Sequence, residues 1–395
     1  MTTSDERSEL ILPPSANVSR RNALRLGAFG LGGITLGGSF LAACGDDDST
    51  TAEPADEPAD EPAAEGRDSI KAHWVYIGPP DDQGWTQRHH EGRQAAIDAL
   101  GDSMESGFTP NIGFDAGTTQ LFQQLVDDGN NIIFANTEYA GLMTDVADAN
   151  PDVAFAETNG HHFTDNTFGY YLAHETTAYL LGIAAGHLAP NGRIGYIGAF
   201  PTATAYNDVN GLLLGARSVN PDANVETVLV STFFDPQAAA TASDALLNNG
   251  VGFLFGVMDE PTFLNKAEDA GVWTGYWNGD FLEQAPEWYT AGFDLGGFKQ
   301  FYTDQCQAVL DGTWSAPSQV HLIDTPLGTW GPNVPQDVQD AVADAASAIA
   351  AGDLHVYEGP LTDNQGNQVL GDGEVIDSVG SYAVDFALEG VTGIE

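Results

Sequence analysis

Short apolar runs and longer amphipathic stretches alternate along the chain from about residue 70 onward. Each apolar run ends in a loop that carries glycine or aspartate, and a stretch of helical period follows it. This alternation predicts βαβ units, in which helices bury both faces of parallel strands. The predicted strands cover residues 72–77, 131–135, 153–156, 168–172, 193–197, 227–230 and 252–255. The predicted helices cover residues 86–100, 142–149, 174–188, 205–218, 237–247 and 261–270.

The same rhythm starts a second time at Arg193. About 330 residues follow Asp68, which is more than one hydrophobic core usually organises. We therefore expect an α/β protein with two Rossmann-like lobes. Solutes bind to such sheets in the loops at the carboxyl ends of the strands.

The N-terminal segment carries an export signal. Arg20 and Arg21 precede an apolar, glycine-rich stretch, which ends in Leu41-Ala42-Ala43-Cys44. A twin arginine before a moderately apolar segment is an export address, and Leu-Ala-Ala-Cys is the pattern that lipoprotein signal peptidase cleaves. We expect residues 1–43 to be a twin-arginine lipoprotein signal peptide and Cys44 to carry lipid. The alternative is a retained anchor helix, and both place the body outside the cytoplasm, tethered to a membrane.

Residues 44–68 predict an extended tether between that anchor and the body. Glu53-Pro54-Ala55-Asp56 recurs in near copies through Ala63, with no apolar side chain larger than alanine. Proline and carboxylates together keep such a segment extended and unpacked.

The chain is strongly acidic, with 12 Lys and Arg against 57 Asp and Glu and a formal net charge of −45. Such a surface repels itself in dilute salt, whereas the Debye length falls to about 3 Å at molar salt. We interpret the composition as adaptation to strong brine; the alternative is an acidic surface that holds a basic partner or calcium. Nucleic acid is disfavoured because it needs clustered cations. Anionic solutes are disfavoured too, unless Arg193 or Arg217 enters the site.

Motifs of enzymes and metal sites are weak. A Walker loop, a Gly-x-Ser-x-Gly elbow and a His-Glu-x-x-His motif are missing from the sequence. Two histidine pairs, at 89–90 and 161–162, are alternatives for a metal, but adjacent helical residues point apart. Residues 363–367 resemble part of a calcium loop, although a β-turn between Leu361 and Val369 explains them better. We expect no catalytic residue, cofactor or metal.

Cys306 lies on a helical face that also contains Phe298, Phe301, Tyr302 and Val309. With Cys44 committed to lipid, Cys306 has no partner for a disulfide. We expect it to be a small buried core residue.

Aromatic and carboxylate side chains gather at the predicted carboxyl ends of strands. Trp85 stands there in the first half, and Phe200 and Phe233 hold matching places in the second half. Two rings on opposite lobes would form a slot for a flat ligand. Stacking on such rings contributes about 0.5–1.5 kcal/mol to binding, beyond the contribution of the buried area. The alternative is that these rings fill the lobe cores or the hinge. Carboxylates and amides at the same ends would accept hydrogen bonds: Asp259, Asn278 and Asp280.

Several ordered strings resemble the basic-membrane-protein family of substrate-binding lipoproteins, which are nucleoside- and purine-binding components of ABC importers. The resemblance spans nearly the whole body from Lys71. The strings are Val75-Tyr76-Ile77-Gly78-Pro79, Gly84-Trp85-Thr86, His89, Gly92-Arg93, Gly192-Arg193-Ile194-Gly195-Tyr196, Ala199-Phe200-Pro201, Asn207, residues 214–221, Phe234-Asp235-Pro236, residues 309–314 and Gly359-Pro360-Leu361.

This resemblance implies a type I periplasmic-binding-protein fold, with two lobes joined by a multi-crossover hinge that close on a purine between aromatic rings. Residues 69–173 and 289–315 would form the N-terminal lobe, and residues 174–288 and 316–395 the C-terminal lobe. Trp85 would stack from the first lobe and Phe233 from the second. The other implied ligand contacts are Asn136, Thr137, Phe200, Asp259, Asn278 and Asp280.

Two departures bear on the ligand. Some purine-nucleoside receptors of the family use a lysine where residues 289–294 here contain none. Asn136-Thr137-Glu138 also differs from the glycine- and phenylalanine-bearing loop of relatives.

The resemblance further implies a lipid-anchored monomer that delivers a small solute to an ABC permease. One alternative is a sensor of the same fold that signals to a membrane receptor. The other is a secreted nucleoside hydrolase, for which Asp259 and Asp280 are the candidate pair.

Overall fold

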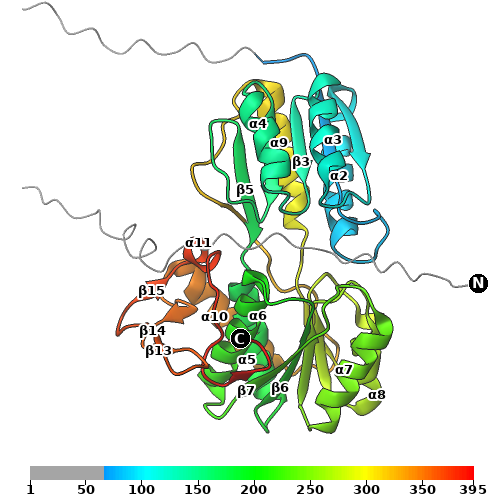
Figure 1. The fold of residues 1–395 in the computed structure, drawn as a ribbon. Coiled ribbons are helices and arrows are strands. Elements are labelled where there is room, and N and C mark those ends of the chain that lie inside the picture. Colours follow the sequence, from blue (N-terminus) through cyan, green and yellow to red (C-terminus); the bar gives the residue numbers. More distant parts are fainter. Residues whose placement is uncertain (1–65) are drawn as a thin grey trace, which may run out of the picture. The chain divides into compact units, whose positions relative to one another are not determined.

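The computed structural model describes residues 66–395, which belong to one unit that starts at Ala64 (Figure 1). The predicted signal peptide, the predicted lipidation site Cys44 and nearly all of the predicted tether lie outside the described residues. Within residues 66–395, no helix has the length and apolar character that crossing a membrane requires.

The first lobe is built on a six-stranded parallel sheet of order β11-β5-β4-β3-β1-β2. Helices α2 and α9 cover one face, and α3 and α4 cover the other (Figure 1). The strands are β1 (Ile70–Val75), β2 (Met104–Thr109), β3 (Ile132–Ala135), β4 (Ala154–Thr158), β5 (Thr167–Leu172) and β11 (His321–Ile323). The helices are α2 (Trp85–Leu100), the short 3₁₀ turn η1 (Gly101–Ser103), α3 (Ala116–Asp127), α4 (Gly141–Ala149) and α9 (Gly297–Asp311).

The second lobe repeats this plan with a parallel sheet of order β10-β9-β8-β6-β7-β16. Helices α5 and α6 pack together on one side, and α7 and α8 on the other. The strands are β6 (Arg193–Gly198), β7 (Asn224–Leu229), β8 (Phe253–Gly256), β9 (Trp273–Tyr276), β10 (Tyr289–Gly292) and β16 (Val391–Thr392). The helices are α5 (His174–Leu188), α6 (Ala203–Val219), α7 (Pro236–Asn248), α8 (Thr262–Ala270) and η2 (Leu282–Gln284).

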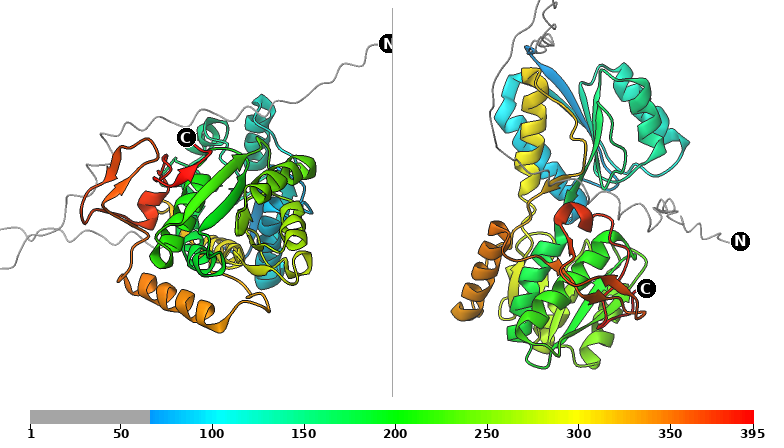
Figure 2. Two further views of the ribbon diagram at one scale, coloured as in Figure 1. Left: turned by 90° about the horizontal axis from the view of Figure 1, so that it is seen from below. Right: turned by 90° about the vertical axis from the view of Figure 1, so that its left-hand side faces the viewer.

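The C-terminal part of the chain packs on the second lobe. Helix α10 (Gln336–Ala351) lies against α5, and the short strands after it form two small antiparallel sheets (Figure 2). Asp363 accepts the amides of Gln365 and Asn367, so the β-turn predicted between Leu361 and Val369 is confirmed. The remaining elements are β12 (Tyr357–Glu358), β13 (Leu361–Thr362), β14 (Gln368–Leu370), β15 (Val375–Ile376) and α11 (Ser378–Ser381).

The chain passes between the two sheets three times: after β5, between β10 and α9, and after β11. The lobe boundaries predicted at 289 and 316 differ from this pairing. Strand β10 pairs with β9 in the second sheet, and β11 pairs with β5 in the first. Both are short strands at the edge of a sheet, next to a point where the chain passes from one lobe to the other. Hydrogen bonding to an adjacent strand decides which sheet such a strand joins, and the sequence does not show that bonding.

Cys306 is fully buried in helix α9, as predicted, and it is a free cysteine. Its environment contains aromatic rings from both α9 and the sheet, and burial raises the pKa of its thiol. A thiol held protonated in an apolar core is unreactive, so Cys306 is a packing residue.

Candidate functional site

Helix α2 begins at the boundary between the lobes, and one carboxylate organises its first turn. Asp82 accepts three backbone amides at 2.9 Å each, those of Gly84, Thr86 and Gln87. The amide of Trp85 instead donates to Asp259 Oδ1 of the second lobe, at 3.1 Å. The unpaired amides at this helix start are therefore shared between one carboxylate of each lobe.

The indole of Trp85 lies between groups of both lobes. Its Nε1 donates to the carbonyl of Asn136 at 2.6 Å, which fixes the ring in the first lobe. The indole of Trp277, from the end of β9, stacks on it with 6.0 Å between ring centroids and 28° between planes. The ring that faces Trp85 from the second lobe is thus Trp277.

The predicted second-lobe ring, Phe233, lies elsewhere. It packs edge-to-face on Phe200 at 5.6 Å in the loops after β6 and β7, and it is 41% exposed. The adjacent Phe234 is 62% exposed. The backbone carbonyl of Phe233 accepts the amide of Asp259 at 2.8 Å, so this loop supports the carboxylate that contacts Trp85.

The side chain of Asn136 ties two loops of the first lobe together. Its Oδ1 accepts the amide of Ile77 at 2.8 Å, and its Nδ2 donates to Thr86 Oγ1 at 3.4 Å. The side chain is buried, whereas Thr137 is partly exposed. Asn136 thus positions the strand ends around Trp85, and Thr137 is the freer of the two predicted polar groups.

Asp259 is a carboxylate with an altered affinity for protons. Burial, together with the nearby negative charge of Asp82, raises its pKa to about 7, although the hydrogen bond from the Trp85 amide opposes the shift. A carboxyl group of this kind can be present near neutral pH either as an acceptor or as a donor of a hydrogen bond.

Asn278 is buried at the lobe boundary, and its amide group is engaged. Its Oδ1 accepts from Arg88 Nε at 2.7 Å, and its Nδ2 donates to the carbonyl of Gln83 at 3.3 Å. Asp280 lies two residues further on, is exposed, and accepts the amide of Leu282 at 3.2 Å. Of the two residues predicted to bind a hydroxyl group, Asn278 is thus buried with its amide group already bonded, whereas Asp280 is exposed.

Trp277 and Arg88 were not predicted as site residues. Trp277 stands beside Asn278 at a strand end, which was a usable signal, but only the polar neighbours were selected. Arg88 lies one turn after Trp85 in a helix that the sequence predicts well. Only the tertiary structure reveals that this turn faces the second lobe.

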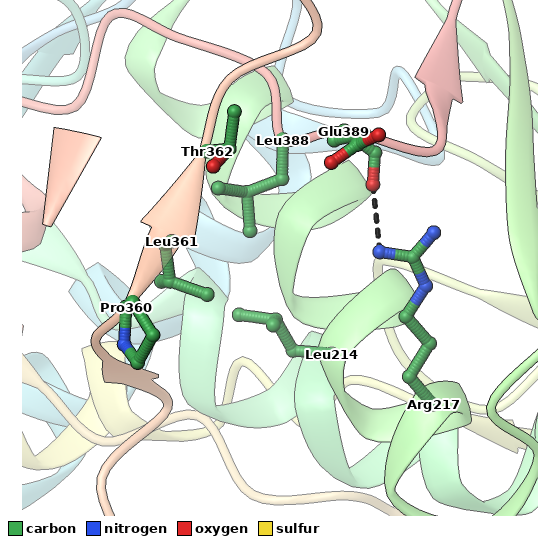
Figure 3. A pocket seen from close by; sticks show the side chains of 7 residues that line it. All are labelled: Leu214, Arg217, Pro360, Leu361, Thr362, Leu388 and Glu389. Carbon is green, nitrogen blue, oxygen red and sulfur yellow. Dashed lines mark hydrogen bonds between the residues drawn. The ribbon is translucent and has the colours of Figure 1, made fainter. Parts of the chain in front are cut away.

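Cavities found within residues 66–395 include two small ones. One of about 60 Å³ adjoins Arg88, Glu91 and Lys299 near the lobe boundary. The other, of about 150 Å³, lies between α6 and the C-terminal hairpin (Figure 3). There Arg217 donates to the carbonyl of Glu389 at 2.6 Å and so holds the segment before β16 on α6. Both volumes are below the roughly 300 Å³ at which sites for drug-sized ligands begin.

The histidine pairs have separate environments. His89 is fully buried and its Nδ1 bonds to Tyr302, whereas His90 contacts Tyr76 and Phe108. His162 pairs with Asp148 at 2.7 Å. Residues 66–395 contain no group of three or more His, Cys, Asp or Glu arranged to hold a metal ion.

Two parallel sheets linked by three crossings, with aromatic and carboxylate groups meeting at their boundary, define a two-lobed protein of the type I periplasmic-binding fold. The chain belongs to the family of ABC transporter substrate-binding proteins described as PnrA-like, whose model matches residues 70–272. The fold is also similar to an ABC transporter solute-binding protein from Conexibacter woesei, with a TM-score of 0.58, 19% identity, and coverage of 73% of this chain and 98% of that one.

Curated relatives extend the match over most of the chain. A purine-binding protein of Brucella abortus is 32% identical over 83% of this chain and 94% of its own length. A putative ABC transporter glucose-binding protein of Haloferax volcanii is 30% identical over 91% of this chain and 96% of its own length. The family predicted from the sequence is therefore confirmed, and family and fold are those of solute-binding proteins.

Proposed function

We propose that this chain is a lipid-anchored receptor on the outer face of the cytoplasmic membrane, which captures a purine base or nucleoside between its lobes and delivers it to an ABC permease. The observation that carries the proposal is the face-to-face pair of Trp85 and Trp277, one from each lobe, beside the carboxylate of Asp259.

The geometry suits a thin planar ligand. A ring inserted between two aromatic faces needs about 7 Å between them, since carbon atoms pack at roughly 3.5 Å. The two indole centroids are 6.0 Å apart in a stacked arrangement, so the lobes would have to open until the two ring faces stand about 7 Å apart to admit one heterocycle. Asp259 and Thr137 would then bind the edge of the ring through its N–H and carbonyl groups. Among relatives, the purine-binding protein of Brucella abortus supports this ligand class.

Calorimetric titration in molar KCl tests the proposal, with adenine, hypoxanthine, adenosine, inosine and glucose as the solutes. The change Trp85→Ala should weaken purine binding by at least about 2 kcal/mol, as for a central aromatic anchor. Trp314→Ala is the matched control, because that indole bonds to Gln305 within the first lobe. No purine binding, or equal affinity after Trp85→Ala, would overturn the proposal.

A hexose is the second candidate, because a relative with 30% identity over 91% of this chain is described as a putative glucose-binding protein. The apolar face of a sugar also packs on indole rings, and carboxylates accept hydrogen bonds from hydroxyl groups. Glucose binding without purine binding in the same titration would favour this candidate.

A sensor and a hydrolase differ from this proposal in the step after solute binding. A sensor would pass the closed form to a membrane receptor, and finding that the protein co-purifies with a permease from detergent extracts would argue against it. A nucleoside hydrolase would need Asp259 and Asp280 to act together, yet Asp280 bonds to Leu282 in an exposed turn. Free ribose after long incubation with adenosine would revive the hydrolase.

A further inference from the structure

The side chain of Arg88 connects helix α2 of the first lobe to the loop after β9 in the second. Its Nε donates to Asn278 Oδ1 at 2.7 Å, and its Nη2 donates to the Asn278 carbonyl at 3.0 Å. Its Nη1 lies 3.0 Å from both carboxylate oxygens of Glu91, one turn along α2. Glu91 therefore orients the guanidinium within the first lobe, and Asn278 receives it from the second.

Two glycines allow the lobes to approach this closely. A Cβ on Gly279 would lie 2.8 Å from Arg88 Nη2, and the φ of 97° at Gly279 is one that side-chain-bearing residues rarely adopt. A Cβ on Gly84 would lie 2.3 Å from Asp259 Oδ1. At both contacts, therefore, a glycine of one lobe leaves room for a polar side chain of the other lobe.

We propose that Arg88 is a positioning residue that latches the closed form of the protein by binding Asn278, without contacting the solute. Both polar ends of the Asn278 side chain are used in the latch, on Arg88 and on Gln83. Asn278 then serves closure instead of solute recognition. The latch acts together with the bond from the Trp85 amide to Asp259.

The latch is built from a cation and a neutral amide, and this has a physical consequence. Ion pairs at exposed sites weaken as salt rises, because counter-ions screen the two charges. The contact of Arg88 with Asn278 contains no second unit charge to be screened. Such a contact would therefore persist in concentrated salt, the condition to which we interpret the net charge of −45 as an adaptation.

Pulsed electron–electron resonance on the solute-free full chain tests the latch without reference to any ligand. Spin labels are attached at Asp98→Cys on α2 and Ala245→Cys on α7, both exposed positions, in a Cys44→Ser background; Cys306 is buried. We expect a closed population in the parent protein that falls at least threefold in Arg88→Gln and in Asn278→Ala. The fall in the double variant should be smaller than the sum of the two single falls, because both changes remove the bond between Arg88 Nε and Asn278 Oδ1.

The matched control is Arg193→Gln, which removes an arginine that pairs with Glu226 within the second lobe. It should leave the distance distribution unchanged. Melting temperatures of all variants, measured by circular dichroism, should stay within a few degrees of the parent, so that loss of folding is not mistaken for opening. The latch is overturned if the parent has no closed population, if Arg88→Gln leaves it intact, or if the two losses add. These outcomes are separate from the question of which solute binds.

Discussion

At the residue scale, the sequence predicts which side chains lie at the strand ends, but it does not predict which residues they contact. Trp85, Asn136 and Asp259 come together at the boundary because each follows a strand of a parallel sheet. Yet Asn136 contacts Trp85 through its backbone carbonyl, and its side chain braces neighbouring loops. Residue type thus indicates what a position can do, and the neighbours determine what it does.

The ring that covers the solute can be identified by comparing Trp277→Ala with Phe233→Ala. We expect Trp277→Ala to weaken binding of the preferred purine by about 2 kcal/mol or more, since its face meets Trp85. Phe233→Ala should weaken it by less than about 0.5 kcal/mol, because this half-exposed ring packs on Phe200. Calorimetric titration of both variants measures the two losses of affinity. A larger loss for Phe233→Ala would show that Phe233, as predicted from the sequence, is the stacking ring of the second lobe.

A buried carboxyl group in the first lobe makes stability depend on pH. Burial raises the pKa of Glu157 to about 8, with a smaller contribution from the nearby Glu138; hydrogen bonds from the amides of Tyr139 and Ala140 oppose it. Between the ordinary value of 4.5 and about 8 the folded protein holds a proton that the unfolded chain releases. Stability therefore falls as pH rises through this window, by roughly 2–4 kcal/mol.

The variant Glu157→Gln should flatten this slope, because an amide keeps the acceptor oxygen and carries no charge. Urea unfolding of parent and variant at pH 5 and pH 8 measures the difference. Asp145→Asn, a change at an exposed position of α4, is the control. Parallel slopes in parent and Glu157→Gln would contradict the argument.

At the element scale, the start of α2 is the part of the fold on which the site depends. The buried side of this helix includes His89 and Arg93, so its polarity pattern alone does not reveal which face packs inward. The aromatic cluster of α9 and the sheet receives both side chains. The inward face of a helix that is partly polar on that face can be identified only when its neighbours are known.

Asp82→Ala should loosen this helix start. Three backbone amides lose their acceptor, which should cost about 1–2 kcal/mol of stability and weaken solute binding through displacement of Trp85. Asp81→Ala is the matched control, because the adjacent aspartate is exposed. Urea denaturation and calorimetry give the two quantities; equal values for the two variants would show that Asp82 does not organise the turn.

At the scale of the whole molecule, the charge imbalance dominates the response to solvent. With 57 acidic and 12 basic residues, most carboxylates have no cationic partner anywhere in the chain. Repulsion among them destabilises the folded form unless counter-ions screen it. This holds irrespective of the solute that the lobes bind.

We therefore expect the melting temperature to rise by several degrees between 0.1 M and 2 M KCl. Differential scanning calorimetry measures it. A variant with Asp337, Asp340 and Asp344 of α10 changed to asparagine should show a smaller rise, because these three exposed carboxylates contribute to the repulsion. A melting temperature that does not change with salt would contradict the interpretation of the acidic composition as an adaptation to brine.

Lipidation at Cys44 would determine where the whole molecule works. Intact-mass spectrometry of the protein from its native membrane should give a chain that starts at Cys44 with added acyl mass. Cys44→Ser should release the protein into the medium or leave it uncleaved. A mature protein that begins before Cys44 and carries no lipid would contradict this prediction.

The sequence by itself determined the α/β class, the repeat into two lobes, helix α5 to the residue and the family, because periodicity and ordered strings are local properties. Three strands at the sheet edges were missed, β2, β10 and β11, because each mixes polar with apolar residues and two of them are very short. Only the tertiary structure decided that Trp277 faces Trp85 and that Arg88 reaches Asn278. Those contacts join residues about 190 positions apart in the chain, and no local pattern encodes such a distance.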